Sequence, residues 1–410
     1  MRQRVSHKGY RNGARDAMIQ IQRAKLKEAL TSNYAAAYAV KAADVDVIAV
    51  YPITPQTTIV EKLSEFVSNG ELNAELIHVE SEHSALSAVV GAAAAGARVF
   101  TATSSQGLEL AHEVLHIASG LRLPIVMALP TRAVSAPISI HNDYSDLMNA
   151  RDTGWVIYIA ASAQEVYDSL IQAYRVAESI YLPVMVAYDG FLMSHTLEPV
   201  ELNDEEDVRR FLPRRKIPHV LDPRRPVTLG PLTSPDWYYE FKYQQVEAMK
   251  EAYKAVREVD SEYRSKFGRG YGVVEGYRVE DADYVVVTYG GVSYGNARAA
   301  ADMARERGIA AGVLRIRLYR PFPTEDVVKT LAGVKAFAVL DRAIMYGSPA
   351  EGPLYKDIAV AMYLHGLNTP GMNIIHGIGQ RTIYVEDIYK IFQMLKESPR
   401  REVVFMGVRV

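Results

Sequence analysis

The chain of 410 residues contains no cysteine. This absence excludes disulfide bonds, zinc sites built from thiolates and a cysteine nucleophile. It also excludes an iron–sulfur cluster held in the usual way by thiolates of this chain. Any such redox centre must therefore belong to another polypeptide.

Long hydrophobic runs are absent as well. The longest apolar stretch, Ala85 to Ala97, is mostly alanine and glycine and is well short of the ~20 residues that a membrane span needs. No apolar signal core follows the basic residues Met1 to Arg15, so secretion is not expected. We therefore expect a cytoplasmic protein with no membrane partner.

A strong charge of either sign is also missing. Lys+Arg 46 and Asp+Glu 48 give a formal net charge of -2, so nucleic acid and anionic membranes are disfavoured as partners. With 49% hydrophobic and 23% charged residues, the composition is that of a packed globular protein. The length favours roughly two to three domains.

Short β-branched runs alternate with alanine-rich stretches from Ala43 to about Leu197. The alternation is typical of βαβ units and predicts an α/β fold, with a doubly wound parallel sheet in residues 34–203. The expected strands are Val45–Val50, Leu76–Val79, Arg98–Ala102, Pro124–Leu129, Val156–Ala160 and Leu182–Ala187, and the expected helices are Gln56–Val67, Glu82–Ala95, Gly107–Ser119 and Ala163–Glu178.

Three further segments complete the predicted organisation. Charges and prolines cluster in residues 204–272, a connector in which Trp237 to Lys266 predicts one long helix. The alternation resumes at Tyr284 and predicts a second, smaller α/β domain at residues 273–410. Residues 1–33 form a basic N-terminal extension that matches neither domain, and we expect it to rest on a partner.

Polar side chains follow four strands of the first predicted sheet. The loops are Tyr51–Pro55, Glu80–Glu82, Thr103–Gly107 and Pro130–Val134. If the sheet is parallel, all four open at one edge, where α/β proteins bind ligands. The loops contain few glycines and neither a GxGxxG nor a Walker pattern, which favours a small organic ligand over a nucleotide.

Three residues in these loops are candidates for chemistry. Glu82, partly withdrawn from water, could share a proton with a ligand ring nitrogen if its pKa is raised, but it could equally oppose the helix dipole. Arg132 offers a planar fork that fits a carboxylate, whereas a structural ion pair with Asp143 or Asp146 is the alternative. Thr54 precedes a proline, so its hydroxyl either positions a substrate or belongs to ordinary turn chemistry.

His112-Glu113-Val114-Leu115-His116 matches the HExxH pattern of zinc proteases. The residues that follow, Ser119 to Arg122, do not supply a third histidine ligand, and the helix belongs to a parallel α/β sheet. We therefore interpret these histidines as helix-surface residues and expect no metal site. Gly290-Gly291 lacks the spacing of a dinucleotide fingerprint and predicts a tight turn between strand and helix.

The same loops resemble the alpha subunit of pyruvate:ferredoxin oxidoreductase, within the 2-oxoacid:ferredoxin oxidoreductase family. The matching stretches are YPITPQT (Tyr51 to Thr57), VESEHSA (Val79 to Ala85), TSSQGL (Thr103 to Leu108), TRAV (Thr131 to Val134), ARDTGW (Ala150 to Trp155) and YDGFLMSH (Tyr188 to His195). They cover most of the chain from Tyr34 to about Val200. The second domain resembles the transketolase carboxyl-terminal type, chiefly through LRIRLYRPFP (Leu314 to Pro323).

The resemblance implies a thiamine diphosphate enzyme whose pyrimidine-binding domain is residues 34–203. It implies that Glu82 binds the aminopyrimidine ring nitrogen and that Thr54 and Arg132 contact the 2-oxoacid, with Arg132 facing its carboxylate. A beta subunit would hold the diphosphate, Mg²⁺ and a [4Fe-4S] cluster, and gamma and ferredoxin-like delta subunits would complete the complex. The implied reaction converts pyruvate and CoA to acetyl-CoA and CO2, with electrons passed to ferredoxin.

Some alternatives remain open at this level. The loop Ala136 to Asn142 differs from the glycine-containing loop that the family predicts near the substrate, so a branched-chain or other 2-oxoacid is also possible. The chain could instead be a non-catalytic assembly subunit, or a stand-alone α/β protein that binds a small acid.

Overall fold

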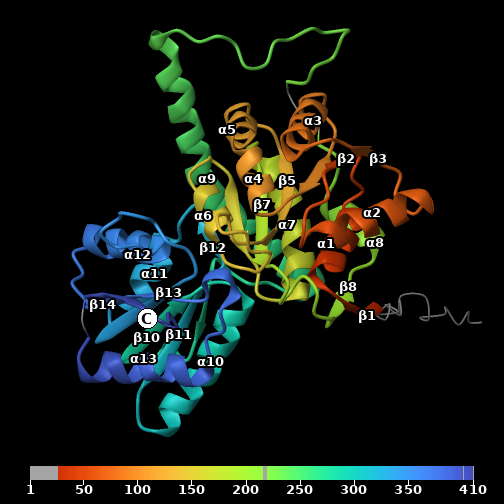
Figure 1. The fold of residues 1–410 in the computed structure, drawn as a ribbon. Helices are drawn as coiled ribbons and strands as arrows, with labels where there is room; N and C mark the ends of the chain where they lie inside the picture. Colours follow the sequence, from red (N-terminus) through yellow and green to blue (C-terminus); the bar gives the residue numbers. More distant parts are fainter. Residues whose placement is uncertain (1–25, 216–218, 400, 410) are drawn as a thin grey trace, which may run out of the picture.

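The computed structural model describes residues 26–215, 219–399 and 401–409. Two parallel-sheet domains lie against each other, and one long helix runs up the side of the first domain and beyond it (Figure 1). The N-terminal extension up to residue 25 lies outside the described residues.

The first domain is built on a seven-stranded sheet with the order β12-β6-β7-β5-β4-β2-β3. Its strands are β2 (Val47–Val50), β3 (Glu75–His78), β4 (Val99–Ala102), β5 (Ile125–Thr131), β6 (Val156–Ile159), β7 (Val184–Asp189) and β12 (Leu318–Arg320). All neighbours are parallel except β12 and β6. The residues of β4 to β7 are all buried, as expected for apolar strands covered on both faces.

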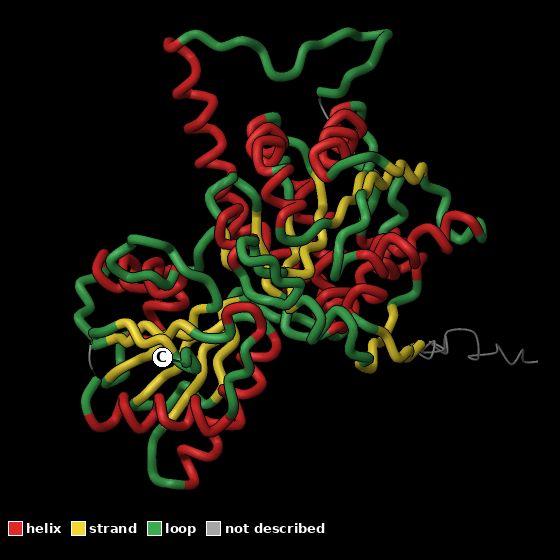
Figure 2. Tube along the Cα trace, viewed as in Figure 1, coloured by secondary structure: helices red, strands yellow, loops and turns green. Residues whose placement is uncertain are grey.

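Helices cover both faces of this sheet (Figure 2). They are α1 (Ser32–Ala42), α2 (Thr57–Ser68), α3 (Glu82–Ala94), α4 (Gln106–Leu110), α5 (His112–Gly120), α6 (Ser145–Ala150), α7 (Ala163–Ile180), α8 (Glu205–Phe211) and α9 (Pro235–Phe267). One hydrophobic core lies under α1, α2 and α7, and the other lies under α3, α5 and α6. The predicted doubly wound arrangement is therefore present, although the helix expected at Gly107–Ser119 is divided at Ala111.

The chain changes direction at β2. Along the sequence β3 is added on one side of β2 and β4 on the other, which makes the space between β2 and β4 a topological switch point. Ligand crevices of doubly wound sheets open at such points, beyond the carboxyl ends of the strands. The loops that follow β2 and β4 therefore border a natural site.

The second domain has a six-stranded sheet with the order β15-β14-β13-β10-β11-β9. Its strands are β9 (Val274–Tyr277), β10 (Tyr284–Thr288), β11 (Ala311–Ile316), β13 (Ala336–Asp341), β14 (Gly371–Ile375) and β15 (Val403–Phe405), and its helices are α10 (Gly291–Glu306), α11 (Thr324–Leu331), α12 (Pro353–Leu364) and α13 (Val385–Glu397), with a 3-10 turn at Ile378–Gln380. Only β9 runs antiparallel to its neighbour. The tight turn predicted at Gly290-Gly291 leads directly into α10.

The two domains share a strand. β12 follows β11 in the chain, leaves the second sheet and pairs with β6 of the first. In the same segment the guanidinium groups of Arg315 and Arg317 are buried and both bind the carboxylate of Glu165, at 3.1 and 3.0 Å. The LRIRLYRPFP motif thus joins the domains.

The end of the N-terminal extension, β1 (Leu26–Leu30), pairs antiparallel with β8 (Glu198–Leu202) of the same chain. The contact with a partner expected for the extension stays a prediction. One expectation about the connector needs correction. The long helix is not only a connector, since its second half packs against α7 and contributes Val256 and Tyr263 to the core of the first domain. Pro235 at its first position and Gly268 beyond its end set its limits. No helix in the described part of the chain is both long and apolar enough to cross a membrane.

Candidate active site

Glu82 is the first residue of α3, just beyond β3. The helix begins here because Ser81 is its N-cap, whose hydroxyl accepts the backbone N–H of Ser84 at 3.2 Å. The Glu82 side chain is therefore not needed as a cap, and the residue is only 7% exposed. Burial raises the pKa of Glu82, and its own backbone amide opposes the rise. Such a carboxylate is suited to sharing a proton with a ligand.

The carboxylate of Glu82 rests against Gly107 in α4. A β-carbon on Gly107 would lie 2.7 Å from the carboxyl carbon of Glu82 and would also overlap the hydroxyl of Thr103. Glycine is therefore required for the carboxylate to keep this position. The buried Thr103 hydroxyl has no hydrogen-bond partner within the described residues, so it is available to a ligand.

The loop between β4 and α4 is held in an unusual conformation. Ser105 has a φ of 51°, its N–H donates to Asp146 Oδ2 at 2.9 Å, and its hydroxyl donates to the carbonyl of Ala133 at 2.5 Å. The side-chain nitrogen of Gln106 is buried and finds no acceptor in the part of the chain that is described. Strain of this kind is often stored at functional sites, and here it lies between Thr103 and Gln106, whose buried polar atoms have no partner among the described residues.

Arg132 follows β5 and is only 6% exposed. Its Nε donates to the carbonyl of Ser139 and its Nη1 to the carbonyl of Thr54, both at 3.0 Å. Among the described residues neither Asp143 nor Asp146 forms an ion pair with the guanidinium, so the structural pair considered as an alternative is not formed. Burial lowers the pKa of Arg132, with Asp146 opposing. The guanidinium is therefore not neutralised by an ion pair among the described residues and is available to bind the carboxylate of a ligand.

Thr54 lies exposed in the turn after β2. Its carbonyl binds Arg132, and the amide of Asn33 donates to the carbonyl of Pro55 at 2.7 Å, which holds the turn against α1. The structure therefore brings Thr54 and Arg132 together. Among the described residues, no hydrogen bond or ion pair joins Glu82 to either of them.

Asp146 connects the two halves of the site, and it was not among the predicted site residues. Its carboxylate is fully buried and accepts the backbone N–H groups of Ser105, Arg132 and Leu147 at 2.9, 3.0 and 2.7 Å. It thereby ties the loop beside Glu82 to the loop that carries Arg132. Burial raises the pKa of Asp146 to about 8, against the three amides.

We expect Asp146→Asn to lower the free energy of unfolding by roughly 1–3 kcal/mol, because an amide NH2 would face a backbone N–H. The loss should depend on pH. Since the pKa of Asp146 is higher in the folded state, about 8 against a usual 3.8, the wild type loses stability as pH rises between those values, whereas the variant does not. The denaturant midpoint of Asp146→Asn should therefore lie further below that of the wild type at pH 5 than at pH 8. A constant difference would contradict the assignment.

The comparisons with known proteins agree with this geometry. A family model described as pyruvate flavodoxin/ferredoxin oxidoreductase, thiamine diphosphate binding, matches residues 38–261, and one described as pyruvate:ferredoxin oxidoreductase core domain II matches residues 282–388. The chain belongs to the pyruvate:ferredoxin oxidoreductase family. The family predicted from the loop motifs is confirmed.

Curated relatives of this pyruvate:ferredoxin oxidoreductase family member include proteins with two different names. Pyruvate synthase subunit PorA of Methanocaldococcus jannaschii is 48% identical over 385 residues, which cover 93% of this chain and 97% of that protein. The Thermotoga maritima protein of the same name is 46% identical, with 91% and 95% covered. Ketoisovalerate oxidoreductase subunit VorA of Pyrococcus horikoshii is 44% identical, with 91% and 94% covered.

Two solved structures show the fold. A 2-oxoglutarate:ferredoxin oxidoreductase from Magnetococcus marinus has a TM-score of 0.70 at 18% identity and is matched over 90% of this chain and 65% of its own, so this chain spans about two thirds of it. A split-gene transketolase, an inactive beta4 tetramer, has a TM-score of 0.55 at 15% identity over 91% of this chain and 100% of its own. The predicted fold class is confirmed.

In this oxidoreductase the second domain presents its own carboxyl edge to the first. Arg342, directly after β13, forms a buried ion pair with Asp189 at the end of β7. Asp189 also accepts the N–H groups of Gly291 at 2.8 Å and Val292 at 3.2 Å, in the first turn of α10, where the helix dipole favours an anion. The second domain is thereby fixed against the first at that edge.

The HExxH residues lie elsewhere, on α5. The rings of His112 and His116 contact each other edge to face at 5.3 Å. Burial lowers the pKa of His116, with His112 and Lys242 adding to the effect. Within residues 26–215, 219–399 and 401–409 no group of three or more potential ligands is placed to hold a metal ion.

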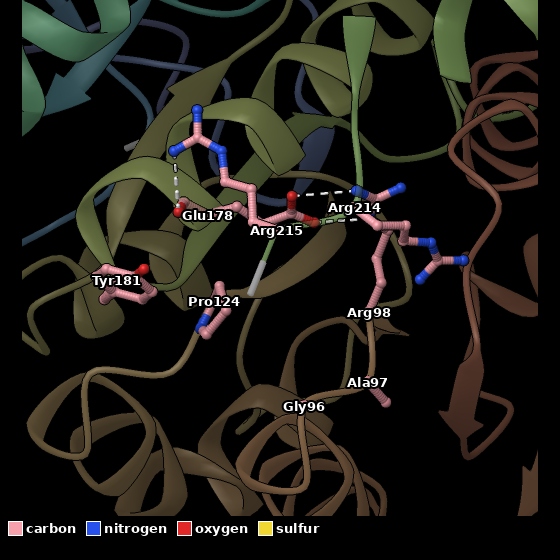
Figure 3. Close-up of a pocket in the computed structure, with 8 residues that line it drawn as sticks. All are labelled: Gly96, Ala97, Arg98, Pro124, Glu178, Tyr181, Arg214 and Arg215. Atoms are coloured by element: carbon pink, nitrogen blue, oxygen red, sulfur yellow. Dashed lines mark hydrogen bonds and ion pairs between the residues drawn. The ribbon is translucent and has the colours of Figure 1, made fainter. Parts of the chain in front are cut away.

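A small cavity of about 30 Å³ lies at the opposite edge of the first sheet, near the start of β4 (Figure 3). Arg98 forms a two-pronged ion pair with Glu178, at 2.6 and 3.0 Å, and Arg214 binds Asp46 at 2.6 Å. With these carboxylates in place, the arginines fasten the start of the connector to the first domain instead of forming an anion site.

Proposed function

We propose that this chain is the catalytic alpha subunit of a pyruvate:ferredoxin oxidoreductase. The enzyme oxidatively decarboxylates pyruvate to acetyl-CoA and CO2 in the presence of CoA, and two electrons pass singly to ferredoxin. The observation that carries the proposal is the buried carboxylate of Glu82, which lies against Gly107 beside the unpartnered hydroxyl of Thr103, in the domain matched by the thiamine diphosphate-binding family model.

The residues around Glu82 fit the pyrimidine ring of thiamine diphosphate. Among the described residues Thr103 and Gln106 offer buried polar atoms without partners, and the carboxylate of Glu82, whose pKa burial raises, would share a proton with a ring nitrogen of the bound cofactor. Thiamine diphosphate, when bound, supplies the nucleophile and the electron sink for decarboxylation of a 2-oxoacid. The part of this chain is to bind the ring, to fix it against Gly107 and to keep water from Glu82.

The second group of residues fits the substrate. Arg132 is fixed in direction by the carbonyls of Thr54 and Ser139, and its remaining N–H donors are available to the carboxylate of a 2-oxoacid. The exposed Thr54 lies next to it and provides a hydroxyl in a turn held by α1. Together they hold the leaving carboxylate in one orientation.

The rest of the catalytic machinery belongs to partner subunits in this proposal. A beta subunit holds the diphosphate, Mg²⁺ and a [4Fe-4S] cluster, and gamma and ferredoxin-like delta subunits complete the electron path. The cysteine-free sequence supports this division, and the relatives are themselves named as subunits. Assembly in the cytoplasm is part of the same proposal.

The substrate preference can be tested directly. The relatives named pyruvate synthase and ketoisovalerate oxidoreductase are almost equally similar to this chain, so 2-oxoisovalerate is the specific second candidate. We expect the copurified complex to reduce a low-potential dye in a CoA-dependent way, with kcat/KM highest for pyruvate, lower for 2-oxoisovalerate and lowest for 2-oxoglutarate. Ile138 and Ile140, the sequence neighbours of the Ser139 whose carbonyl binds Arg132, are apolar and provide no cation for a second carboxylate.

The other two function classes predict different results. A non-catalytic assembly subunit would leave the activity of the complex unchanged when Glu82 is replaced. A stand-alone acid-binding protein would bind pyruvate without any partner, and isothermal titration of the purified chain would detect it.

A further inference from the structure

The first half of α9 and the loop before it stand away from the body of the protein (Figure 1). We call the described residues 219–247 the aromatic arm. Its helical part is exposed around almost its whole circumference and yet carries Trp237, Tyr238, Tyr239, Phe241 and Tyr243. Trp237 is 65% exposed and Tyr239 is 77% exposed. A helix with large aromatic side chains on several faces gains stability only when another surface covers it.

An apolar groove of about 990 Å³ lies between the aromatic arm and the first domain. Leu121 and Leu123 line it from the first domain, Phe241 and Val227 line it from the arm, and Arg122, His219 and Lys242 contribute basic side chains. None of the described residues that line the groove is acidic. The groove therefore fits an apolar segment flanked by carboxylates.

The tip of the aromatic arm, residues 236–240, is itself an apolar segment flanked by carboxylates. Asp236 and Glu240 flank Trp237-Tyr238-Tyr239, and no salt bridge to either carboxylate is found among the described residues. The tip of one chain does not fill its own groove, because Tyr238 already forms part of the groove wall while Trp237 and Tyr239 remain exposed. Each chain thus carries both the groove and a tip that is complementary to such a groove, and Trp237 and Tyr239 of the tip are not covered within the same chain.

We propose that two copies of this chain exchange their aromatic arms, with Trp237 and Tyr239 of one copy seated in the groove of the other. Asp236 and Glu240 then face Lys242 and His219 across the contact. Because each copy gives a tip and accepts one, a twofold axis closes the pair without leaving a free groove. The active-site residues lie at the other edge of the sheet and take no part.

The available surface is sufficient for a stable pair. Aromatic side chains bury roughly 150–250 Å² each when fully covered, and the five in the arm are at least half exposed. Two exchanged arms can therefore bury on the order of 1,000 Å² through these side chains alone, the lower limit for a specific interface.

Because this chain has no cysteine of its own, an introduced cysteine can form disulfides at one known position of the chain. Two differently tagged copies of the full chain, one with Tyr239→Cys and the other with Val227→Cys, are produced together with the partner subunits and oxidised. We expect a disulfide-linked species that carries both tags. The control replaces Tyr239→Cys with Tyr363→Cys, an equally exposed tyrosine on α12, and should give no such species.

Charge reversal distinguishes a specific contact from a chance collision. Asp236→Lys with Glu240→Lys on the tip copy should lower the cross-linking yield about 10-fold, as expected for opposed like charges at a contact. Lys242→Glu on the groove copy should restore it. Three results would each overturn the proposal: a cross-linking yield that stays the same in both charge variants, an equal yield with Tyr363→Cys, or a cross-link of Tyr239→Cys to a partner subunit.

Discussion

Glu82→Gln is expected to lower turnover of pyruvate by the assembled complex about 10²- to 10⁴-fold, the usual contribution of a positioned general acid or base. The amide keeps the shape of the side chain against Gly107 but cannot share a proton. The measurement is the rate of CoA-dependent dye reduction at saturating pyruvate. Equal rates for the variant and the wild type would remove Glu82 from the mechanism.

The stability of the same variant provides an independent check. Because burial raises the pKa of Glu82 above its usual 4.5, the charged form is less stable in the folded protein than in water. The wild type therefore loses stability as pH rises past that usual value, and Glu82→Gln does not. We expect a Tm at pH 8 no lower than that of the wild type, so lost activity is not lost folding.

Glu80→Gln is the matched control for both measurements. Glu80 lies two residues earlier on the exposed rim and accepts a hydrogen bond from the hydroxyl of Ser84. Its replacement should leave the rate within about twofold, since surface changes of this kind usually alter free energies by at most about 0.5 kcal/mol. A loss as large as that of Glu82→Gln would point to a general effect on the start of α3.

Arg132→Lys is expected to lower kcat/KM for pyruvate roughly 10- to 150-fold, which corresponds to about 1.5–3 kcal/mol for hydrogen bonds to a charged group. Lysine keeps the positive charge but cannot form a two-pronged contact with a carboxylate while binding the carbonyls of Thr54 and Ser139. Most of the loss should appear in KM if Arg132 binds the substrate carboxylate.

Arg122→Lys is a control with the same kind of bonding. Arg122 precedes β5 at the opposite edge, and its guanidinium also donates to two backbone carbonyls, of Tyr181 at 2.9 Å and Ile180 at 2.7 Å. Any cost of losing arginine–carbonyl bonds should therefore appear in both variants as lower stability. A rise in KM confined to Arg132→Lys assigns the effect to the substrate, whereas equal KM values in both variants would refute the assignment.

The sequence predicted the first domain well because its strands are short, apolar and buried on both faces. Such runs are visible without knowledge of their partners, and parallel order places their ends at one edge. β12 could not be found in this way, since three residues beside a proline-rich break become a strand only because β6 has a free edge. The pairing of β1 with β8 is likewise long-range and has no local signal.

The site was predicted only in part, for a related reason. Glu82, Arg132 and Thr54 stood out because their side chains have recognisable chemistry at strand ends. Asp146 was considered only as a partner for a guanidinium, yet its carboxylate binds backbone amides, which every residue type offers equally. The requirement for Gly107 is similarly invisible, because the carboxylate that it accommodates comes from another helix.

The shared strand limits how the protein can be divided. A fragment that ends after α9 would lack β12, so the outer N–H and C=O groups of β6 would be bare, and Glu165 would remain buried without Arg315 or Arg317. An uncovered strand edge is a template for aggregation, and an uncompensated buried charge is strongly destabilising. The thiamine-binding half should therefore precipitate when it is expressed alone. A shortened version of this subunit that stays soluble has to include the residues up to the end of β12.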